Sequence, residues 1–220
     1  MIRCFLALCL FSLCPEFAFA DEGWKLIENS RDGIKSEKRD VTGSPIVEFR
    51  GTGIVEATVG KLASILYDRE RAPEWVMNMS SSRMVRWISA NEFIEYDHVA
   101  TPPVIMRDRD FVSKVTVTVD PKSKVTVFLY NSVTDPGLPE TKYIRGDILN
   151  TTFTLTPIDQ NHTLVVGEII CDPKGAVPKW VVNFFQHDWP MDTLRRLRKQ
   201  TAKLDVKDDV KILALLNSKN

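Results

Sequence analysis

The fold is decided by two stretches of sequence, Met106-Arg107-Asp108-Arg109-Asp110-Phe111-Val112 and Pro173-Lys174-Gly175-Ala176-Val177-Pro178-Lys179-Trp180. The first is an arginine-rich turn that leads into a strand, because Phe111, Val115 and Val117 alternate with polar residues as in a sheet with one wet face. The second is a strand exit and a tight turn that lead into a helix, since proline is well tolerated in the first helical turn. Together they predict a sheet covered by a helix.

Alternation of apolar and polar residues predicts the rest of the sheet. Strands are expected at 34–39, 46–56, 84–89, 92–100, 111–119, 125–133, 144–157 and 163–171. Short links join consecutive strands, which favours antiparallel pairing.

Helices are predicted where apolar residues recur at spacings of three and four. One short helix is expected at 21–29, a second after Thr58 as its N-cap, and a third helical turn that buries Trp75. A long helix begins near Pro178, carries an apolar stripe that must be buried, and kinks at Pro190. A last helical piece follows a charged break.

The first twenty residues have the pattern of a cleaved signal peptide. Arg3 gives a positive start, the run Cys4 to Cys14 is apolar apart from one serine, and Ala18-Phe19-Ala20 offers small residues to a signal peptidase. The apolar run is shorter than the roughly 20 residues that span a bilayer. We expect residues 1–20 to be removed and residues 21–220 to form a single exported domain. The alternative is an uncleaved N-terminal anchor.

Cysteine and charge content limit the compartment and the partners that the sequence allows. Three of the four cysteines leave with the signal, so Cys171 alone remains and an intramolecular disulfide is impossible. A short signal without disulfides favours a bacterial periplasm. Lysine and arginine number 29, and aspartate and glutamate also number 29, so no bulk field recruits nucleic acid. The basic run 195–199 is expected to be a solvated helix face, with a membrane-docking patch as the alternative.

Four landmarks occur in a fixed order along the chain: Arg31-Asp32-Gly33-Ile34, Pro73-Glu74-Trp75, Arg109-Asp110-Phe111-Val112, and Pro173 to Pro178 leading into Asn183. In this order the chain resembles the START (steroidogenic acute regulatory protein-related lipid-transfer) domains over nearly its whole mature length. The resemblance implies an α+β helix-grip fold, a curved antiparallel sheet wrapped around a long C-terminal helix with two short helices between early strands. It also implies a cavity for one lipid or sterol-like molecule, gated by the C-terminal helix and loops.

The resemblance further implies a charged pair in the cavity wall. Arg109 matches the arginine of the family's Arg-Asp-Phe-Val signature, and the acid of the preceding strand falls near Asp97, where glutamate is usual. An arginine in a cavity is tolerable only if its charge is matched and hydrogen-bonded. The alternative is that Asp97 and Arg109 form a cross-strand pair at the sheet edge, and Arg107 is a rival for the role.

We therefore predict a non-enzymatic lipid-binding or lipid-transfer protein. It is expected to be a monomer with no cofactor, no metal and no nucleic-acid partner, and to touch membranes transiently. The predicted ligand-binding residues, beside Asp97, Arg109 and Arg107, are Trp87, Tyr96, Val117, Leu129 and Ile148 on strands and Val181, Phe184, Phe185 and Trp189 on the helix. Each of these apolar positions is equally consistent with plain core.

Two other classes of function remain open. An enzyme of the cyclase or aromatase type could work in the same cavity, but its acid–base candidates are poor. His98, His162 and His187 show no catalytic spacing, and the side chains of His187 and Asp188 are expected about 100° apart on a helix. A ligand-sensing interaction module could use the loop 134–140, where Leu138 looks exposed.

Overall fold

The computed structural model describes residues 23–101 and 107–217, so the predicted signal peptide lies outside the described residues. This part of the chain forms a ten-stranded sheet in the order β1-β2-β3-β10-β9-β7-β6-β5-β4, with β8 beside β6. The strands are β1 Lys25–Asn29, β2 Lys35–Asp40, β3 Val47–Val55, β4 Met79–Trp87, β5 Glu92–Val99, β6 Arg109–Val119, β7 Thr126–Ser132, β8 Ile144–Arg145, β9 Asp147–Pro157 and β10 Thr163–Asp172. The strands along this order pair antiparallel, as predicted, whereas β8 runs parallel to β6.

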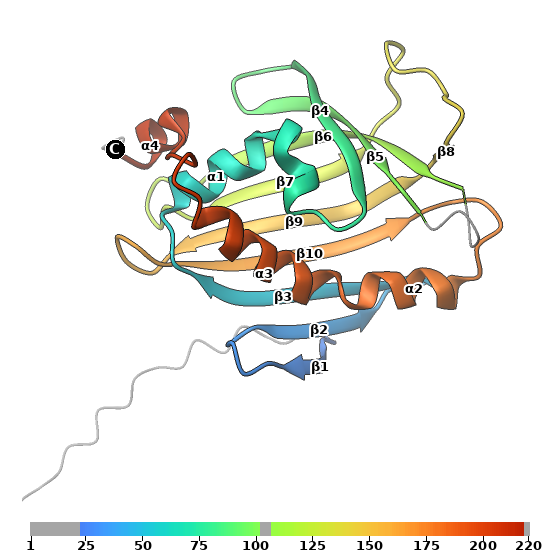
Figure 1. Ribbon diagram of the computed structural model, residues 1–220, viewed down its shortest axis with the longest axis horizontal. Coiled ribbons are helices and arrows are strands. Elements are labelled where there is room, and N and C mark those ends of the chain that lie inside the picture. Colours follow the sequence, from blue (N-terminus) through green and yellow to red (C-terminus); the bar gives the residue numbers. More distant parts are fainter. Residues whose placement is uncertain (1–22, 102–106, 218–220) are drawn as a thin grey trace, which may run out of the picture.

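The helices lie on the concave side of the curved sheet (Figure 1). They are α1 Val59–Tyr67, the 3-10 helix η1 Arg69–Glu74, α2 Lys179–His187, α3 Trp189–Thr201 and α4 Val210–Asn217. The helices α2 and α3 follow one another across β3 and β10, so the sheet grips the C-terminal helical segment. The predicted α+β helix-grip fold is confirmed. None of the helices in the described part of the chain is long and apolar enough to cross a membrane.

Local sequence explains where the helices begin and break. Thr58 caps α1, because its hydroxyl oxygen accepts the backbone N–H of Lys61 at 2.9 Å. The predicted kink near Pro190 is a full break between α2 and α3, since proline lacks the N–H that a continuous helix would need. Gly51 of β3 lies opposite, and a Cβ there would be 2.8 Å from the Cβ of Pro190. The glycine therefore lets the helix break rest directly on the sheet.

The predicted helix at 21–29 is wrong, because this segment contains the edge strand β1. Lys25 lies opposite Lys38 of β2, so β1 satisfies backbone groups that β2 would otherwise expose. Trp24 is buried under two guanidinium groups, with Arg39 at 4.6 Å and Arg50 at 4.2 Å from the ring centroid. Pairing with the next strand has overridden a local pattern that fitted either structure.

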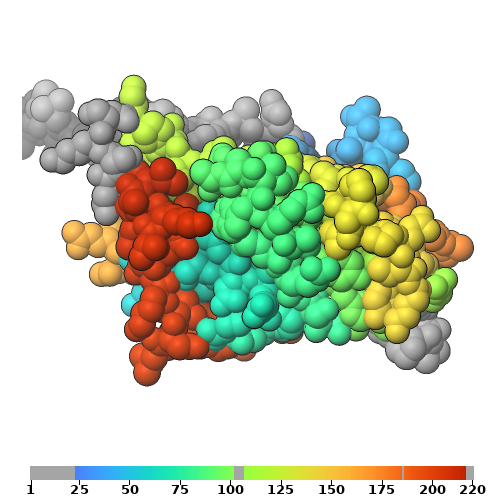
Figure 2. Space-filling view, turned by 90° about the horizontal axis from the view of Figure 1, so that it is seen from above, coloured from blue at the N-terminus to red at the C-terminus, as the bar shows by residue number. Residues whose placement is uncertain are grey.

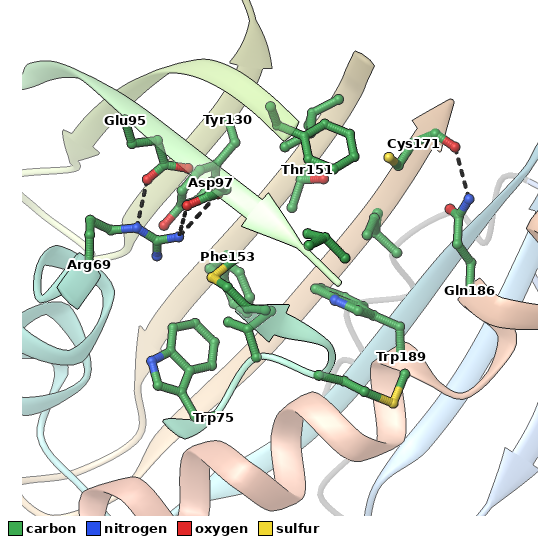
Figure 3. A pocket seen from close by; sticks show the side chains of 17 residues that line it. Arg69, Trp75, Glu95, Asp97, Tyr130, Thr151, Phe153, Cys171, Gln186 and Trp189 are labelled. Atoms are coloured by element: carbon green, nitrogen blue, oxygen red, sulfur yellow. Dashed lines mark hydrogen bonds and ion pairs between the residues drawn. The ribbon is translucent and has the colours of Figure 1, made fainter. Parts of the chain in front are cut away.

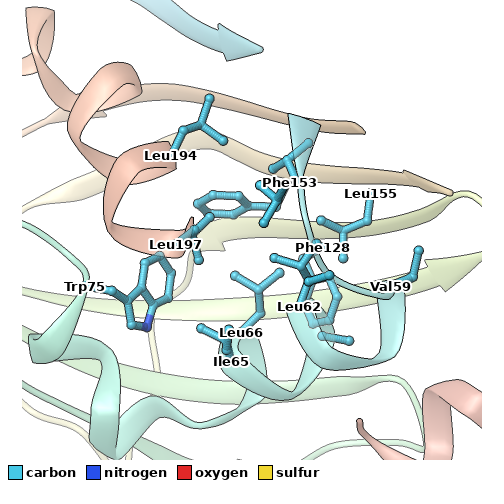
Figure 4. Packing of buried hydrophobic residues seen from close by; sticks show 14 of the residues in the cluster. Val59, Leu62, Ile65, Leu66, Trp75, Phe128, Phe153, Leu155, Leu194 and Leu197 are labelled. Carbon is cyan, nitrogen blue, oxygen red and sulfur yellow. The ribbon is translucent and has the colours of Figure 1, made fainter. Parts of the chain in front are cut away.

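The hydrophobic core fills the end of the molecule that contains α1 (Figure 4). It joins α1, α3 and α4 to the inner face of the sheet, and its buried members include Val59, Leu62, Leu66, Trp75, Phe128, Leu155, Leu194 and Leu197. Side chains of this size each contribute about 1.5–3 kcal/mol on burial. The predicted burial of Trp75 is confirmed, at 1% exposure.

Two further segments pack on the sheet, the loop after β7 on its outer face and α4 on its inner side beside α1. The loop after β7 packs Leu138 against Ile94 and Val112 on the outer face, so this leucine is buried and does not face the inside of the sheet. The expectation that Leu138 is exposed is wrong. At the other end α4 lies beside the green segment of β4 (Figure 2), where the ammonium of Lys211 is 4.2 Å from the ring centroid of Trp87.

Candidate functional site

An apolar cavity of about 200 Å³ lies between the inner face of the sheet and the junction of α2 with α3 (Figure 3). Most of its wall is hydrophobic, and the aromatic members are Trp75, Phe111, Tyr130, Phe153 and Trp189. A second cavity of about 150 Å³ adjoins it, and the two share the side chains of Val99, Phe111, Cys171 and Gln186. The site is therefore a short apolar chamber at the end of the sheet covered by α2.

One end of the larger cavity is charged. Arg69, at the start of η1, places its Nε 2.7 Å from Oε2 of Glu95 and its Nη2 3.4 Å from both carboxylate oxygens of Asp97. Glu95 and Asp97 are two residues apart on β5, so both side chains point to the inner face. All three side chains are at most 5% exposed. Such charges are tolerable in a core only because they neutralise one another.

Burial and mutual charge set the protonation of this cluster. Burial, with the neighbouring carboxylate of Asp97 adding to it, raises the pKa of Glu95 well above its ordinary value although Arg69 acts in the opposite direction. Burial alone would lower the pKa of Arg69, but Glu95 and Asp97 together raise it, so the guanidinium stays charged. One guanidinium is thus the counterion of two carboxyl groups.

Outside the Arg69 cluster, four buried polar groups of the cavity wall have no hydrogen-bond partner for one of their atoms among the described residues. They are the hydroxyls of Tyr130 and Thr151, the indole Nε1 of Trp75 and the Oε1 atom of Gln186. Tyr130 of β7 and Thr151 of β9 are directly paired across the two strands. The amide nitrogen of Gln186 donates to the carbonyl of Cys171 at 2.8 Å, which ties α2 to β10.

The pair implied by the resemblance, Asp97 with Arg109, is not formed. Asp97 lies opposite Phe111 in the sheet, whereas Arg109 lies opposite Val99, one step nearer the second cavity. The guanidinium of Arg109 donates instead to three backbone carbonyls, those of Pro173 at 3.1 Å, Lys174 at 3.3 Å and Arg107. Burial lowers the pKa of Arg109. The loop after β10 therefore binds the guanidinium of Arg109. Arg69 lies beside Asp97, at the position where Arg109 was expected.

The rival arginine, Arg107, is exposed and donates to the carbonyl of Lys142 at 2.5 Å. It lines neither of the two adjoining cavities.

Apart from those on α2, the other predicted wall residues divide into three groups. Asp97, Ile148 and Trp189 line the larger cavity, and Val117 is part of the core cluster. Three strand residues lie elsewhere: Trp87 is 38% exposed, Tyr96 donates to Asp110 at 3.1 Å, and Leu129 alternates with the buried Phe128 and Tyr130.

On α2, Val181 is half-buried and Phe184 is 68% exposed, and neither lines the two adjoining cavities. The sequence predicts that the apolar stripe of α2 faces inward at these positions, but Val182 and Gln186 face the second cavity instead. The side chain of Phe185 lies outside the described residues.

The site residues that sequence reasoning missed are Arg69, Glu95, Tyr130, Thr151 and Gln186. A signal for two of them was present, because Phe93, Glu95, Asp97 and Val99 share one phase of β5. Two acids in a buried phase require a cation. Nothing in the local sequence of η1 indicates that Arg69 supplies it.

Each of the three histidines contacts an aspartate outside the cavity walls. His98 Nε2 is 2.9 Å from Asp108, His162 Nδ1 is 2.9 Å from Asp159, and His187 Nδ1 is 2.7 Å from Asp188. The last contact corrects the expectation that His187 and Asp188 point apart, because the pair lies at the end of α2, where the helix breaks. No group of three or more metal-ligating side chains occurs in residues 23–101 and 107–217.

A curved antiparallel sheet that grips a C-terminal helical segment and encloses an apolar chamber defines a helix-grip protein. The profile described as START domain matches residues 13–205, and the chain belongs to this family. Members of the family generally bind or transfer lipids.

Relatives by sequence and by structure agree with this assignment. The chain is 28% identical to an uncharacterized protein of Pseudomonas aeruginosa over 83% of this chain and 88% of the relative. It is 27% identical to the mitochondrial steroidogenic acute regulatory protein of Danio rerio over 80% of this chain and 66% of the relative. Among solved structures, a STAR-related lipid transfer protein fragment from Xanthomonas axonopodis is 26% identical, has a TM-score of 0.73, and covers 82% of this chain and 99% of its own. Human STARD10 has a TM-score of 0.76 at 20% identity, covering 84% of this chain and 76% of its own.

Proposed function

We propose that this protein binds one hydrophobic molecule, a lipid or sterol-like compound, in the cavity beneath α2 and carries it as a monomer. The observation that carries the proposal is a largely apolar chamber whose polar groups gather at defined points of its wall. Apolar burial at roughly 25 cal/mol per Å² would supply most of the affinity, and the few polar groups would orient the ligand. The proposed activity is binding and carriage rather than catalysis.

Native mass spectrometry of the mature chain, 21–220, purified without detergent and followed by solvent extraction, tests the proposal. We expect a monomer with a stoichiometric adduct that extracts as one lipid class. A bare polypeptide that stays bare after incubation with liposomes would refute carriage. The matched variants are Ile148→Trp, which fills the cavity, and Leu149→Trp, whose site is 45% exposed. Only the first should lose the adduct.

We also propose that α2 touches the membrane when ligand is exchanged. This helix exposes Trp180 at 73% and Phe184 at 68%, one helical turn apart. Tryptophan and phenylalanine on one face of a helix favour the membrane interface. Trp180→Ser should reduce co-sedimentation with liposomes, whereas Leu204→Ser, at a site that is 90% exposed beyond α3, should not. Equal co-sedimentation of the two variants would exclude α2 as the contact.

Export is the third part of the proposal. The positive start, apolar run and small residues within 1–20 support cleavage after Ala20 and a periplasmic location. N-terminal sequencing of protein from the periplasm of a bacterial host should begin at Asp21. Retention of the intact N-terminus in the membrane fraction would favour an anchor.

A further inference from the structure

The hydroxyl pair of Tyr130 and Thr151 is the least explained feature of the cavity. Both side chains are at least nine-tenths buried, at 4% and 7% exposure, and neither hydroxyl has a hydrogen-bond partner among the described residues. A buried hydroxyl without a partner costs about 1–3 kcal/mol. Two such groups on directly paired strands, both lining one cavity, therefore indicate a place for a polar atom that comes from outside the chain.

The neighbouring charges decide which polar group fits. Arg69 faces both Glu95 and Asp97, so the cluster is neutral when Glu95 holds its proton and negative when it does not. In neither state does it offer a spare positive charge. A carboxylate or phosphate would meet like charge and lose its hydration, which is unfavourable in an apolar chamber. A hydroxyl can both donate and accept, and so fits two hydroxyls beside a carboxylate.

We propose that the cavity selects an uncharged, hydroxyl-bearing lipid, and that Tyr130 and Thr151 bind its hydroxyl group. This inference rests on the proposed function and narrows it to one class of ligand. The recognising groups lie on β7 and β9, whereas Arg109 lines the second cavity and donates to the carbonyls of Pro173, Lys174 and Arg107. Fatty acids and phospholipids are predicted to be rejected at this end of the cavity.

Cavity size suggests suitable probes. At roughly 30 Å³ per non-hydrogen atom, the liquid volume of one water, adjoining cavities of about 200 and 150 Å³ hold roughly ten to twelve atoms. Decanol, decanoate, decylamine and decane share this size and differ in the group at one end. Displacement of the neutral fluorescent probe 2-aminonaphthalene, which is of the same size as the four compounds, from the mature protein then compares them directly.

We expect decanol to displace the probe at a concentration about tenfold lower than decane or decanoate, the size of one or two hydrogen bonds. Tyr130→Phe and Thr151→Val together should remove this advantage and leave decane unchanged. Tyr130→Phe alone provides a milder variant should the double one fail to fold. Thr154→Val is the matched control, since Thr154 lies three residues along β9 and outside the cavity lining.

Failure of the hydroxyl selection and failure of lipid carriage give different results. Equal displacement by all four compounds, or strongest displacement by decanoate or decylamine, would overturn the hydroxyl selection and leave carriage intact. An alcohol preference that survives in the double variant would overturn the role of Tyr130 and Thr151. No binding of the probe or of any compound would overturn the proposed function and this inference together.

Discussion

Replacing Arg69 with methionine is the most direct test of how the charged end of the cavity is held. Methionine keeps much of the length of the side chain and removes its charge, so Glu95 and Asp97 lose their shared partner. The three side chains are 4%, 1% and 5% exposed, so solvent screens the remaining carboxylates poorly. Removing one partner of a buried ion pair costs about 3–5 kcal/mol. Because the cluster borders a cavity that admits water, we expect about 3 kcal/mol, a large share of a total of about 5–15 kcal/mol.

Urea unfolding at about pH 5 and about pH 7 measures this loss and its cause. Burial already raises the pKa of Glu95 in the folded protein. A carboxyl whose folded pKa is raised stabilises the protein fully below its unfolded pKa, and this contribution is lost as pH rises through the folded value. Arg69→Met removes the cation that opposed this shift, so its penalty should be larger at the higher pH. Adding Glu95→Gln should restore part of the stability there.

A loss below about 1 kcal/mol at both pH values would refute the reasoning, because it would mean that the cluster is hydrated like a surface pair. A pH-independent loss would attribute the effect to packing rather than to charge.

Three further predictions concern the contacts of α2 and α3 with the sheet and the opening of the cavity. Gly51→Ala should lower the free energy of unfolding by about 1–3 kcal/mol in a urea titration, because its Cβ would lie 2.8 Å from Pro190. Gly53→Ala is the control and should lower it less, since its nearest contact is the Ile34 side chain at 3.2 Å. Asn183→Ala removes the acceptor of the Val47 N–H at 3.1 Å and should speed hydrogen exchange at that amide; unchanged exchange would show that α2 is held otherwise. Burial raises the pKa of Cys171 to about 12, so iodoacetamide should label it slowly at about pH 8 and fast in urea, and rapid labelling of the folded protein would mean that the cavity opens readily.

The strands and helices with strong periodic patterns could be predicted from the sequence. Alternation at 111–119 gave the inner face of β6, and the cap at Thr58 gave the start of α1. The segment 21–29 could not be assigned, because an edge strand is fixed by the neighbour it pairs with rather than by its own residues. The sequence predicts one strand over 144–157, whereas the structure divides it at Gly146 into β8, which pairs parallel with β6, and β9.

The candidate site was harder to predict than the fold. Asp97, Ile148 and Trp189 could be placed in the cavity, because strand phase and the apolar stripe of the helix fix which side they face. The partner of Asp97 could not be found, since Arg69 is 28 residues away on a 3-10 helix without periodicity. An arginine can also reach backbone carbonyls as well as acids, and Arg109 does so. Ion-pair partners of long side chains therefore need the tertiary structure.

Stability and binding are divided along the length of the sheet. At the α1 end large side chains fill the interior, whereas at the α2 end about 200 Å³ has no side chain in it. At about 24 cal/mol per Å³, a cavity of this size costs about 5 kcal/mol. The chain could recover this energy by changing Thr151 or Ile148 to a larger residue, so the cavity and its unpartnered hydroxyls oppose stability at the same place. A ligand that fills the space and hydrogen-bonds to the hydroxyls would offset both the cost of the cavity and the cost of the unpartnered hydroxyls. Its binding should raise the melting temperature as the ligand concentration rises above Kd.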